Sequence, residues 1–110
     1  MKQIKVCLIG YGYWGSKLAR NFQNSNFFNL TSIIDISKKN LEKAKRDFPL
    51  AKIGNDYKEF IKKQNISLVV ISTPTKTHFQ IAKYTLEKKI NILVEKPLSL
   101  SIREVKVLEN

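Results

Sequence analysis

The chain has 110 residues, 43% of them apolar, which suits one globular domain and excludes both a disordered chain and a two-domain protein. No apolar run is long enough to span a membrane and no secretory signal follows the first lysines, so the sequence predicts a cytoplasmic protein. Lysine and arginine outnumber aspartate and glutamate by 20 to 9, and the net charge of +11 favours an anionic ligand such as a nucleotide.

The first predicted element is a strand at Ile4–Ile9, rich in β-branched residues, and the pattern G-x-G-x-x-G follows it directly. Gly10 permits a tight turn out of the strand, Gly12 lets the main chain approach a pyrophosphate, and Gly15 lets the next helix pack closely on the sheet. That helix is predicted from about Trp14 to Gln23. The amides at its start, with the positive end of the helix dipole, would face the phosphates.

Three other side chains in this first unit carry less specific signals. Cys7 is the single cysteine of the sequence, which excludes an internal disulfide and a cysteine metal cluster. Its place in the middle of a strand favours a buried core residue over a reactive thiol. Tyr13 and Trp14 either cover the pyrophosphate or pack as aromatic residues at the helix start, and the sequence leaves both interpretations open.

The second predicted strand runs from Leu30 to Asp35 and ends on a carboxylate. Asp35 lies 20 residues after Gly15 (35 − 15), where an acid can accept hydrogen bonds from the ribose hydroxyls of the adenosine. The alternative is that Asp35 only forms a turn ahead of the next helix. A carboxylate there repels a 2′-phosphate, so NAD is predicted in preference to NADP, although Lys38 and Lys39 soften the repulsion.

The remaining elements continue the alternation of strands and helices, and this order predicts an α/β fold. They are a helix capped by Ser37 and ended by Pro49, a strand at Lys52–Ile53, a helix after an Asp56/Glu59 capping box, a strand at Leu68–Ile71, a helix opened by a Thr77/Gln80 capping box, a strand at Asn91–Val94 and a helix from Ser101. The predicted architecture is a Rossmann-type doubly wound parallel sheet with strand order 3-2-1-4-5. Ligands of such sheets bind at the carboxyl ends of the strands.

Two further motifs follow predicted strands at that same edge. Ser72-Thr73-Pro74 comes after the fourth strand, with His78 four residues later, and Glu95-Lys96-Pro97 comes after the fifth. Together with the glycine loop, these motifs resemble the N-terminal NAD-binding domain of the Gfo/Idh/MocA oxidoreductase family over essentially the whole chain. The stretch Gly12-Tyr13-Trp14-Gly15, followed by Arg20-Asn21-Phe22, is similar to family members that act on nucleotide-linked amino sugars.

The resemblance implies an oxidoreductase that moves a hydride between nicotinamide and a carbon of a sugar, nucleotide sugar or cyclitol. It makes Lys96 the catalytic candidate, because a lysine beside the nicotinamide can hydrogen-bond the substrate oxygen and share its proton transfer. It also places Glu95 near the nicotinamide ribose and the run Ser72-Thr73-Pro74 along the cleft. His78 is predicted as a neighbour of the cofactor site, and Lys96 is counted with the cofactor-binding residues as well. The alternatives are a structural role for His78 at a helix start and Lys96 as one more surface lysine.

The family pattern is expected to be incomplete in these 110 residues, because no substrate domain accompanies the cofactor domain. We therefore expect NAD binding with little or no turnover, and self-association through the sheet face that a second domain would cover. A non-catalytic NAD(H)-binding or sensing module is the second hypothesis. A basic nucleic-acid-binding protein is the third, and it is disfavoured because the lysines are spread over several helical segments rather than gathered in one stripe.

Overall fold

The computed structural model describes residues 3–63 and 65–94, and the predictions made for Glu95, Lys96 and the helix from Ser101 lie outside these residues. The described elements are β1 (Ile4–Ile9), α1 (Tyr13–Gln23), β2 (Phe28–Ile34), α2 (Lys38–Asp47), β3 (Lys52–Gly54), α3 (Tyr57–Lys63), β4 (Leu68–Ile71), α4 (Thr75–Glu87) and β5 (Asn91–Val94). All neighbouring strands pair in parallel, in the order β3-β2-β1-β4-β5. The predicted Rossmann-type sheet is confirmed.

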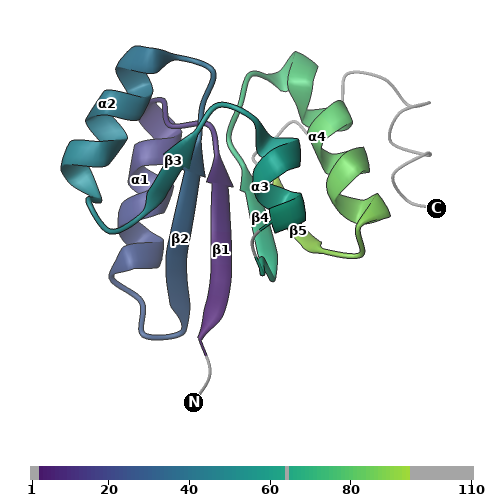
Figure 1. Cartoon of the computed structure of the whole chain (residues 1–110), viewed down its shortest axis with the longest axis horizontal. Helices are drawn as coiled ribbons and strands as arrows, with labels where there is room; N and C mark the ends of the chain where they lie inside the picture. The colour runs from purple at the N-terminus through teal and green to yellow at the C-terminus, as the bar shows by residue number, and fades with distance from the viewer. Residues whose placement is uncertain (1–2, 64, 95–110) are drawn as a thin grey trace.

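Helices cover both faces of the sheet, so the core has two halves (Figure 1). On one face α1 and α2 pack on the strands, with Ala19, Phe22 and Ala44 among the buried residues. On the other face α3 and α4 contribute Ile61 and Ala82 to a second buried cluster. The central strand β4 and the later part of β1, residues 6–9, are buried on both faces, which explains why each reads as an unbroken apolar run in the sequence.

A β-bulge interrupts the pairing of β1 with β2. Val6 is paired with Leu30 but the next residue, Cys7, is paired with Ser32, so Thr31 has no partner of its own on β1. The Thr31 hydroxyl donates a hydrogen bond to the Val6 carbonyl at 3.0 Å and so supports the irregular step.

Cys7 is completely buried in the middle of β1, as its position in the sequence indicated. Burial raises the pKa of its thiol to about 11, because the thiolate is poorly solvated in an apolar core. The thiol therefore stays protonated at neutral pH, and Cys7 acts as a small core residue.

Two helices begin as their capping residues predict. The Ser37 hydroxyl accepts a hydrogen bond from the Asn40 amide at 3.2 Å and caps α2. The Asp56 carboxylate caps α3 through the Lys58 amide at 3.0 Å. Glu59 pairs with Lys63 on the exposed side of the helix, so the reciprocal half of the predicted capping box is replaced by an ion pair.

The predicted start of α4 is wrong. The helix begins at Thr75, and its N-cap residue is Pro74, three residues ahead of the predicted cap Thr77. Thr77 lies inside the first turn, and its hydroxyl donates to the Pro74 carbonyl at 2.8 Å. A threonine that bonds back to the preceding turn resembles a cap in the sequence, which is why the pattern misplaced the boundary.

None of the helices in the described residues is long and apolar enough to cross a membrane.

Candidate functional site

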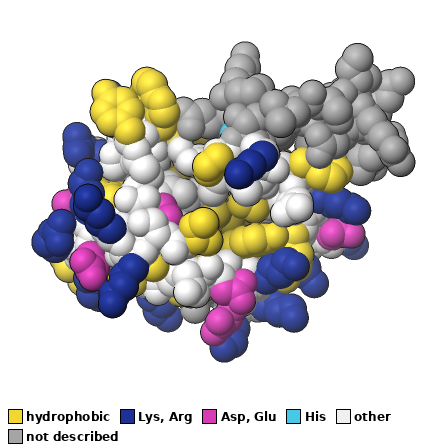
Figure 2. All heavy atoms as spheres, turned by 90° about the horizontal axis from the view of Figure 1, so that it is seen from above, with side chains coloured by type: hydrophobic (Ala, Val, Ile, Leu, Met, Phe, Trp, Pro, Cys, Tyr) yellow, Lys and Arg dark blue, Asp and Glu magenta, His cyan; other side chains and the backbone are white. Residues whose placement is uncertain are grey.

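A cleft of about 570 Å³ lies at the carboxyl edge of the sheet, between the β1–α1 loop, the end of β2 and the β4–α4 loop. Figure 2 looks onto this edge: apolar and uncharged side chains lie in the middle of the view with one Lys or Arg side chain beside them, and most other Lys and Arg side chains lie toward the periphery. The cleft collects most of the residues that the sequence proposed for a cofactor. These are Gly10, Gly12, Tyr13, Trp14, Asp35, Ser72, Thr73 and Pro74.

The floor of the cleft is a close contact between two main-chain segments. Gly10 has a φ of +103°, and a Cβ atom there would stand 2.5 Å from the Ser72 carbonyl oxygen. A Cβ atom on Gly15 would stand 2.0 Å from the Gly10 carbonyl oxygen. These distances are far below van der Waals contact, so both positions require glycine for steric reasons. They hold the start of α1 tightly against the ends of β1 and β4.

Gly12 differs from the other two glycines, because its missing side chain leaves open space. A Cβ atom on Gly12 would have no protein atom within 4 Å, and its φ of −86° is accessible to any residue. Gly12 is also the N-cap of α1, where no side-chain cap forms and the first turn carries no acid. The amides at this helix start thus face an open surface that suits an anion.

Asp35 lies just beyond the end of β2 and binds three groups through its carboxylate. One oxygen, Oδ1, accepts from the Ser37 amide at 2.8 Å. The other, Oδ2, accepts from the Tyr11 amide at 2.7 Å and from the Asn40 side chain at 3.1 Å. Asp35 therefore forms the turn that the alternative interpretation expected, and it also joins the glycine loop to the start of α2.

Tyr11 connects the same loop to the other end of α2. Its side chain is buried, and its hydroxyl donates a 2.6 Å hydrogen bond to the Asp47 carboxylate. The Tyr11 ring also packs edge-on against the Phe48 ring, with the two ring centres 6.2 Å apart. Burial is the main cause that raises the pKa of Tyr11 well above its usual value, and the hydrogen bond to Asp47 raises it further. The phenol therefore remains a donor at neutral pH. No sequence pattern indicates this role of Tyr11, because an aromatic side chain inside a glycine loop carries no periodicity or motif of its own.

The second wall of the cleft is the loop after β4. The Ser72 amide donates to the Ile9 carbonyl at 2.8 Å, which continues the pairing of β4 with β1 into the loop. His78 is buried beneath the loop on α4 and donates a hydrogen bond from Nε2 to the Thr73 carbonyl. The structure thus places His78 behind the wall of the cleft, where it positions Thr73, and a cofactor contact by His78 stays a prediction.

Tyr13 and Trp14 stand at the rim of the cleft rather than in the core. Their side chains are 68% and 57% exposed, and their rings contact each other edge-on with the ring centres 5.1 Å apart. The Lys17 ammonium lies 4.3 Å from the Tyr13 ring centre and 5.1 Å from the Trp14 ring centre. The cluster places two cation–π contacts of one lysine beside the open start of α1, where the ammonium adds positive charge to that side of the cleft.

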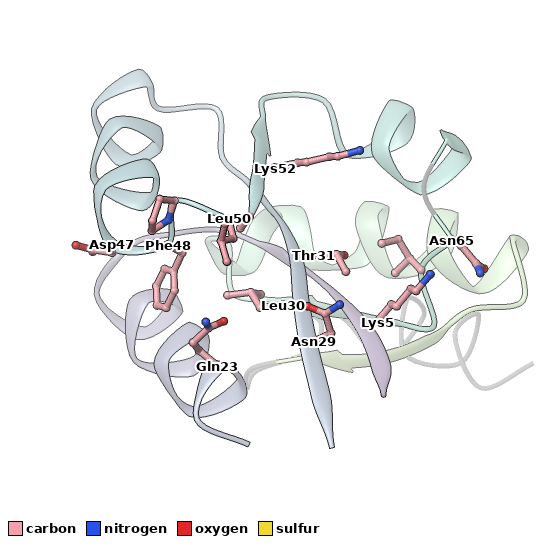
Figure 3. A pocket seen from close by; sticks show the side chains of 13 residues that line it. Lys5, Gln23, Asn29, Leu30, Thr31, Asp47, Phe48, Leu50, Lys52 and Asn65 are labelled. Carbon is pink, nitrogen blue, oxygen red and sulfur yellow. The ribbon is translucent and has the colours of Figure 1, made fainter. Parts of the chain in front are cut away.

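A second cavity, of about 590 Å³, lies away from these loops (Figure 3). Its lining comes from the amino-terminal parts of β1 and β2 and from the segments that lead into β3 and β4. Parallel sheets bind ligands beyond the carboxyl ends of their strands, and this cavity is at the opposite edge. The carboxyl-edge cleft, and not this cavity, is therefore the candidate functional site.

The family model described as an oxidoreductase family with an NAD-binding Rossmann fold matches residues 4–109. The chain belongs to the Gfo/Idh/MocA oxidoreductase family.

Two curated relatives and one solved structure illustrate the breadth of this family. The NAD⁺-dependent scyllo-inositol 2-dehydrogenase of Bacillus subtilis is 32% identical over 105 residues, covering 94% of this chain and 31% of the relative. The α-N-acetylgalactosaminidase of Shewanella oneidensis is 31% identical over 113 residues, and the match covers 94% of this chain and 25% of the relative.

A solved structure of GenD2 from gentamicin A biosynthesis, in complex with NAD, superposes with a TM-score of 0.92 at 26% identity. It covers 98% of this chain and 31% of that protein. The chain thus spans less than a third of the length of the relatives that it matches. It is an NAD-binding domain of the Gfo/Idh/MocA type.

The residues of the cleft fit NAD on structural grounds. The dinucleotide needs an uncapped helix start for its pyrophosphate, and Gly12 leaves both the amides and the space above them open. It needs an acceptor near the adenosine ribose, and Asp35 lines the same cleft. When bound, NAD supplies the nicotinamide ring that accepts or donates the hydride.

Several cleft residues carried no signal in the sequence. Ile36, directly after Asp35, is 92% exposed and lines the cleft as a bare aliphatic surface. Asn40 on α2 and Asn55 after β3 bring side-chain amides to the same region. Their shared position, one short loop beyond the carboxyl end of a strand, is the signal that could have found them. By residue type alone, an apolar or amide residue near the end of a strand cannot be distinguished from an ordinary surface residue.

Proposed function

We propose that this chain is the cofactor-binding part of an NAD-dependent oxidoreductase that transfers a hydride between nicotinamide and a carbon of a sugar, nucleotide sugar or cyclitol. The observation that carries the proposal is the open start of α1 at Gly12, which shares one cleft with Asp35 and the loop after β4. The inositol dehydrogenase among the relatives supports the substrate class. Residues that hold the substrate would lie in the remaining two thirds of such a protein.

In this proposal each part of the cofactor has its own contacts. Gly12 and the first amides of α1 would hold the pyrophosphate. Asp35 would accept from the adenosine ribose, and the exposed side chain of Ile36 would offer an apolar surface to the adenine. Thr73 and Pro74, on the opposite wall, would hold the nicotinamide half.

The cofactor assignment predicts a specific result for Asp35. Replacing Asp35 with Asn removes the charge that repels a 2′-phosphate and weakens the acceptor for the ribose. We expect NAD affinity to fall about tenfold, in line with a lost hydrogen bond to a charged group, while NADP affinity falls less or rises. The measurement is a titration of NAD and NADP, followed by the fluorescence of Trp14, the one tryptophan of the sequence.

The ratio of the two affinities separates recognition from loop stability. Because Asp35 also holds the Tyr11 and Ser37 amides, a loosened loop would weaken both cofactors alike. Asp56→Asn is the matched control, since the Asp56 carboxylate likewise accepts the main-chain amide two residues later but does not line the cleft. An unchanged preference for NAD in Asp35→Asn would contradict the ribose role.

Lys96 is proposed as the catalytic residue of the whole enzyme, with Glu95 near the nicotinamide ribose. In the complete protein, Lys96→Ala is expected to lower kcat by about a hundredfold or more, as for loss of a general acid–base group, with little change in NAD affinity. Steady-state rates together with NAD titration test this. A normal kcat in Lys96→Ala would remove the lysine from the mechanism and leave the cofactor site standing.

The glycosidase among the relatives favours a second candidate, in which NAD is held by the same site and the net reaction is hydrolysis of a glycoside. The two candidates differ in their products. An oxidoreductase accumulates NADH in proportion to the sugar that it oxidises, whereas a hydrolase releases a sugar with no net NADH. Absorbance at the NADH band during turnover separates them.

A further inference from the structure

The Asp35 carboxylate has little hydrogen-bonding capacity left for a cofactor. A carboxylate offers about four acceptor sites, two on each oxygen. The Tyr11 amide and the Asn40 side chain both donate to Oδ2, and the Ser37 amide donates to Oδ1. One site therefore remains, on Oδ1. The adenosine ribose of NAD presents two hydroxyl groups, at C2′ and C3′, and this carboxylate has room for only one of them.

Asn40 is placed to bind the other hydroxyl. It is half-buried in the first turn of α2 and lines the cleft beside Asp35, with its Nδ2 atom 3.1 Å from Oδ2 of that residue. This bond uses one of the two amide hydrogens, and it fixes the plane of the amide group. The second hydrogen and the amide oxygen remain as a donor and an acceptor next to the carboxylate.

We propose that Asn40 is a specificity-determining residue that shares the recognition of the adenosine ribose with Asp35. Asp35 accepts from one hydroxyl through Oδ1, and the Asn40 amide binds the second. The inference rests on the proposed function, since it assumes that the ribose lies beside Asp35. It also gives the preference for NAD a second cause, because a neutral amide at this position supplies no cation for a 2′-phosphate.

Asn40 can be changed without loss of the helix cap. The bond that caps α2 joins the main-chain amide of Asn40 to the Ser37 hydroxyl, and truncation of the side chain leaves both groups in place. Asn40→Ala is thus expected to fold as the parent chain does, which thermal unfolding would verify. Asn21→Ala is the matched control, since Asn21 is an exposed helical asparagine that does not line the cleft.

The test uses NAD and its two analogues that lack the 2′- or the 3′-hydroxyl of the adenosine ribose. We expect Asn40→Ala to weaken NAD binding about three- to tenfold, the range for one neutral hydrogen bond. With one of the two analogues the variant and the parent chain should bind equally well, because the hydroxyl that Asn40 contacts is absent. Calorimetric titration of all three cofactors into both proteins measures this.

Two results would overturn the inference: no loss of NAD affinity in Asn40→Ala, or an equal loss for NAD and both analogues. The second would mean that Asn40 only supports the position of Asp35. Neither result would contradict the proposed function, as long as substitution of Gly12 still weakens NAD binding. Loss of that dependence would instead remove the cofactor site itself.

Discussion

Gly12→Val is expected to abolish NAD binding and to leave the fold intact. A Cβ atom at this position has no atom within 4 Å beyond its chain neighbours, and a φ of −86° is accessible to non-glycine residues, so we expect the fold to accept the substitution. The added side chain would instead occupy the space over the first amides of α1 and displace the pyrophosphate from them. Loss of two or more charge-assisted hydrogen bonds should raise the Kd roughly a hundredfold or more.

Titration calorimetry and thermal unfolding measure the two halves of this prediction separately. Gln23→Val is the matched control, since it places the same bulk on an exposed position at the far end of α1. Gly12→Ala should give an intermediate Kd because its methyl group is smaller. If Gly12→Val bound NAD as tightly as the parent chain, the pyrophosphate would lie elsewhere and the proposed function would fail.

Most of the fold could be predicted from local patterns. The strands Ile4–Ile9, Leu68–Ile71 and Asn91–Val94 have the predicted bounds, because each reads as a short, mostly apolar run ended by polar or turn residues. The strict alternation of elements with right-handed crossovers predicts a doubly wound parallel sheet and leaves few strand orders, among them the order 3-2-1-4-5 that the structure has. Motifs that follow different strands meet in one cleft for the same reason.

The contacts within the cleft could not be predicted, because they depend on tertiary geometry. Asp35 reads as an acid at a strand end, but its three donors come from the glycine loop and from α2. Tyr11 reaches Asp47 across 36 positions of sequence, and no periodicity records such a pair. Thr77 misled the capping pattern because its hydroxyl bonds within the helix turn. The sequence thus predicts which loops form the site, and the structure shows how each loop is held.

Gly15→Ala is expected to destabilise the protein strongly, in contrast to Gly12. On a helix interior, alanine is favoured over glycine by about 1 kcal/mol, so propensity alone predicts a more stable protein. The new methyl group, however, would stand 2.0 Å from the Gly10 carbonyl oxygen, and main chain cannot swing aside as a side chain can. Overpacking costs about 1–3 kcal/mol in side-chain cores, and this backbone contact should exceed that range.

We therefore expect the free energy of unfolding of Gly15→Ala to fall by about 3 kcal/mol or more, with a Tm lowered by more than about 10 °C for a domain of this size. Gly12→Ala, the same chemical change three residues earlier, should unfold close to the parent temperature. Denaturant and thermal unfolding of the pair compare the two sites directly. Equal stability of the two variants would show that α1 does not sit on the ends of β1 and β4 as tightly as the Gly10–Gly15 contact requires. The two glycines would then no longer have separate tasks, Gly15 in seating the helix and Gly12 in opening it to the cofactor.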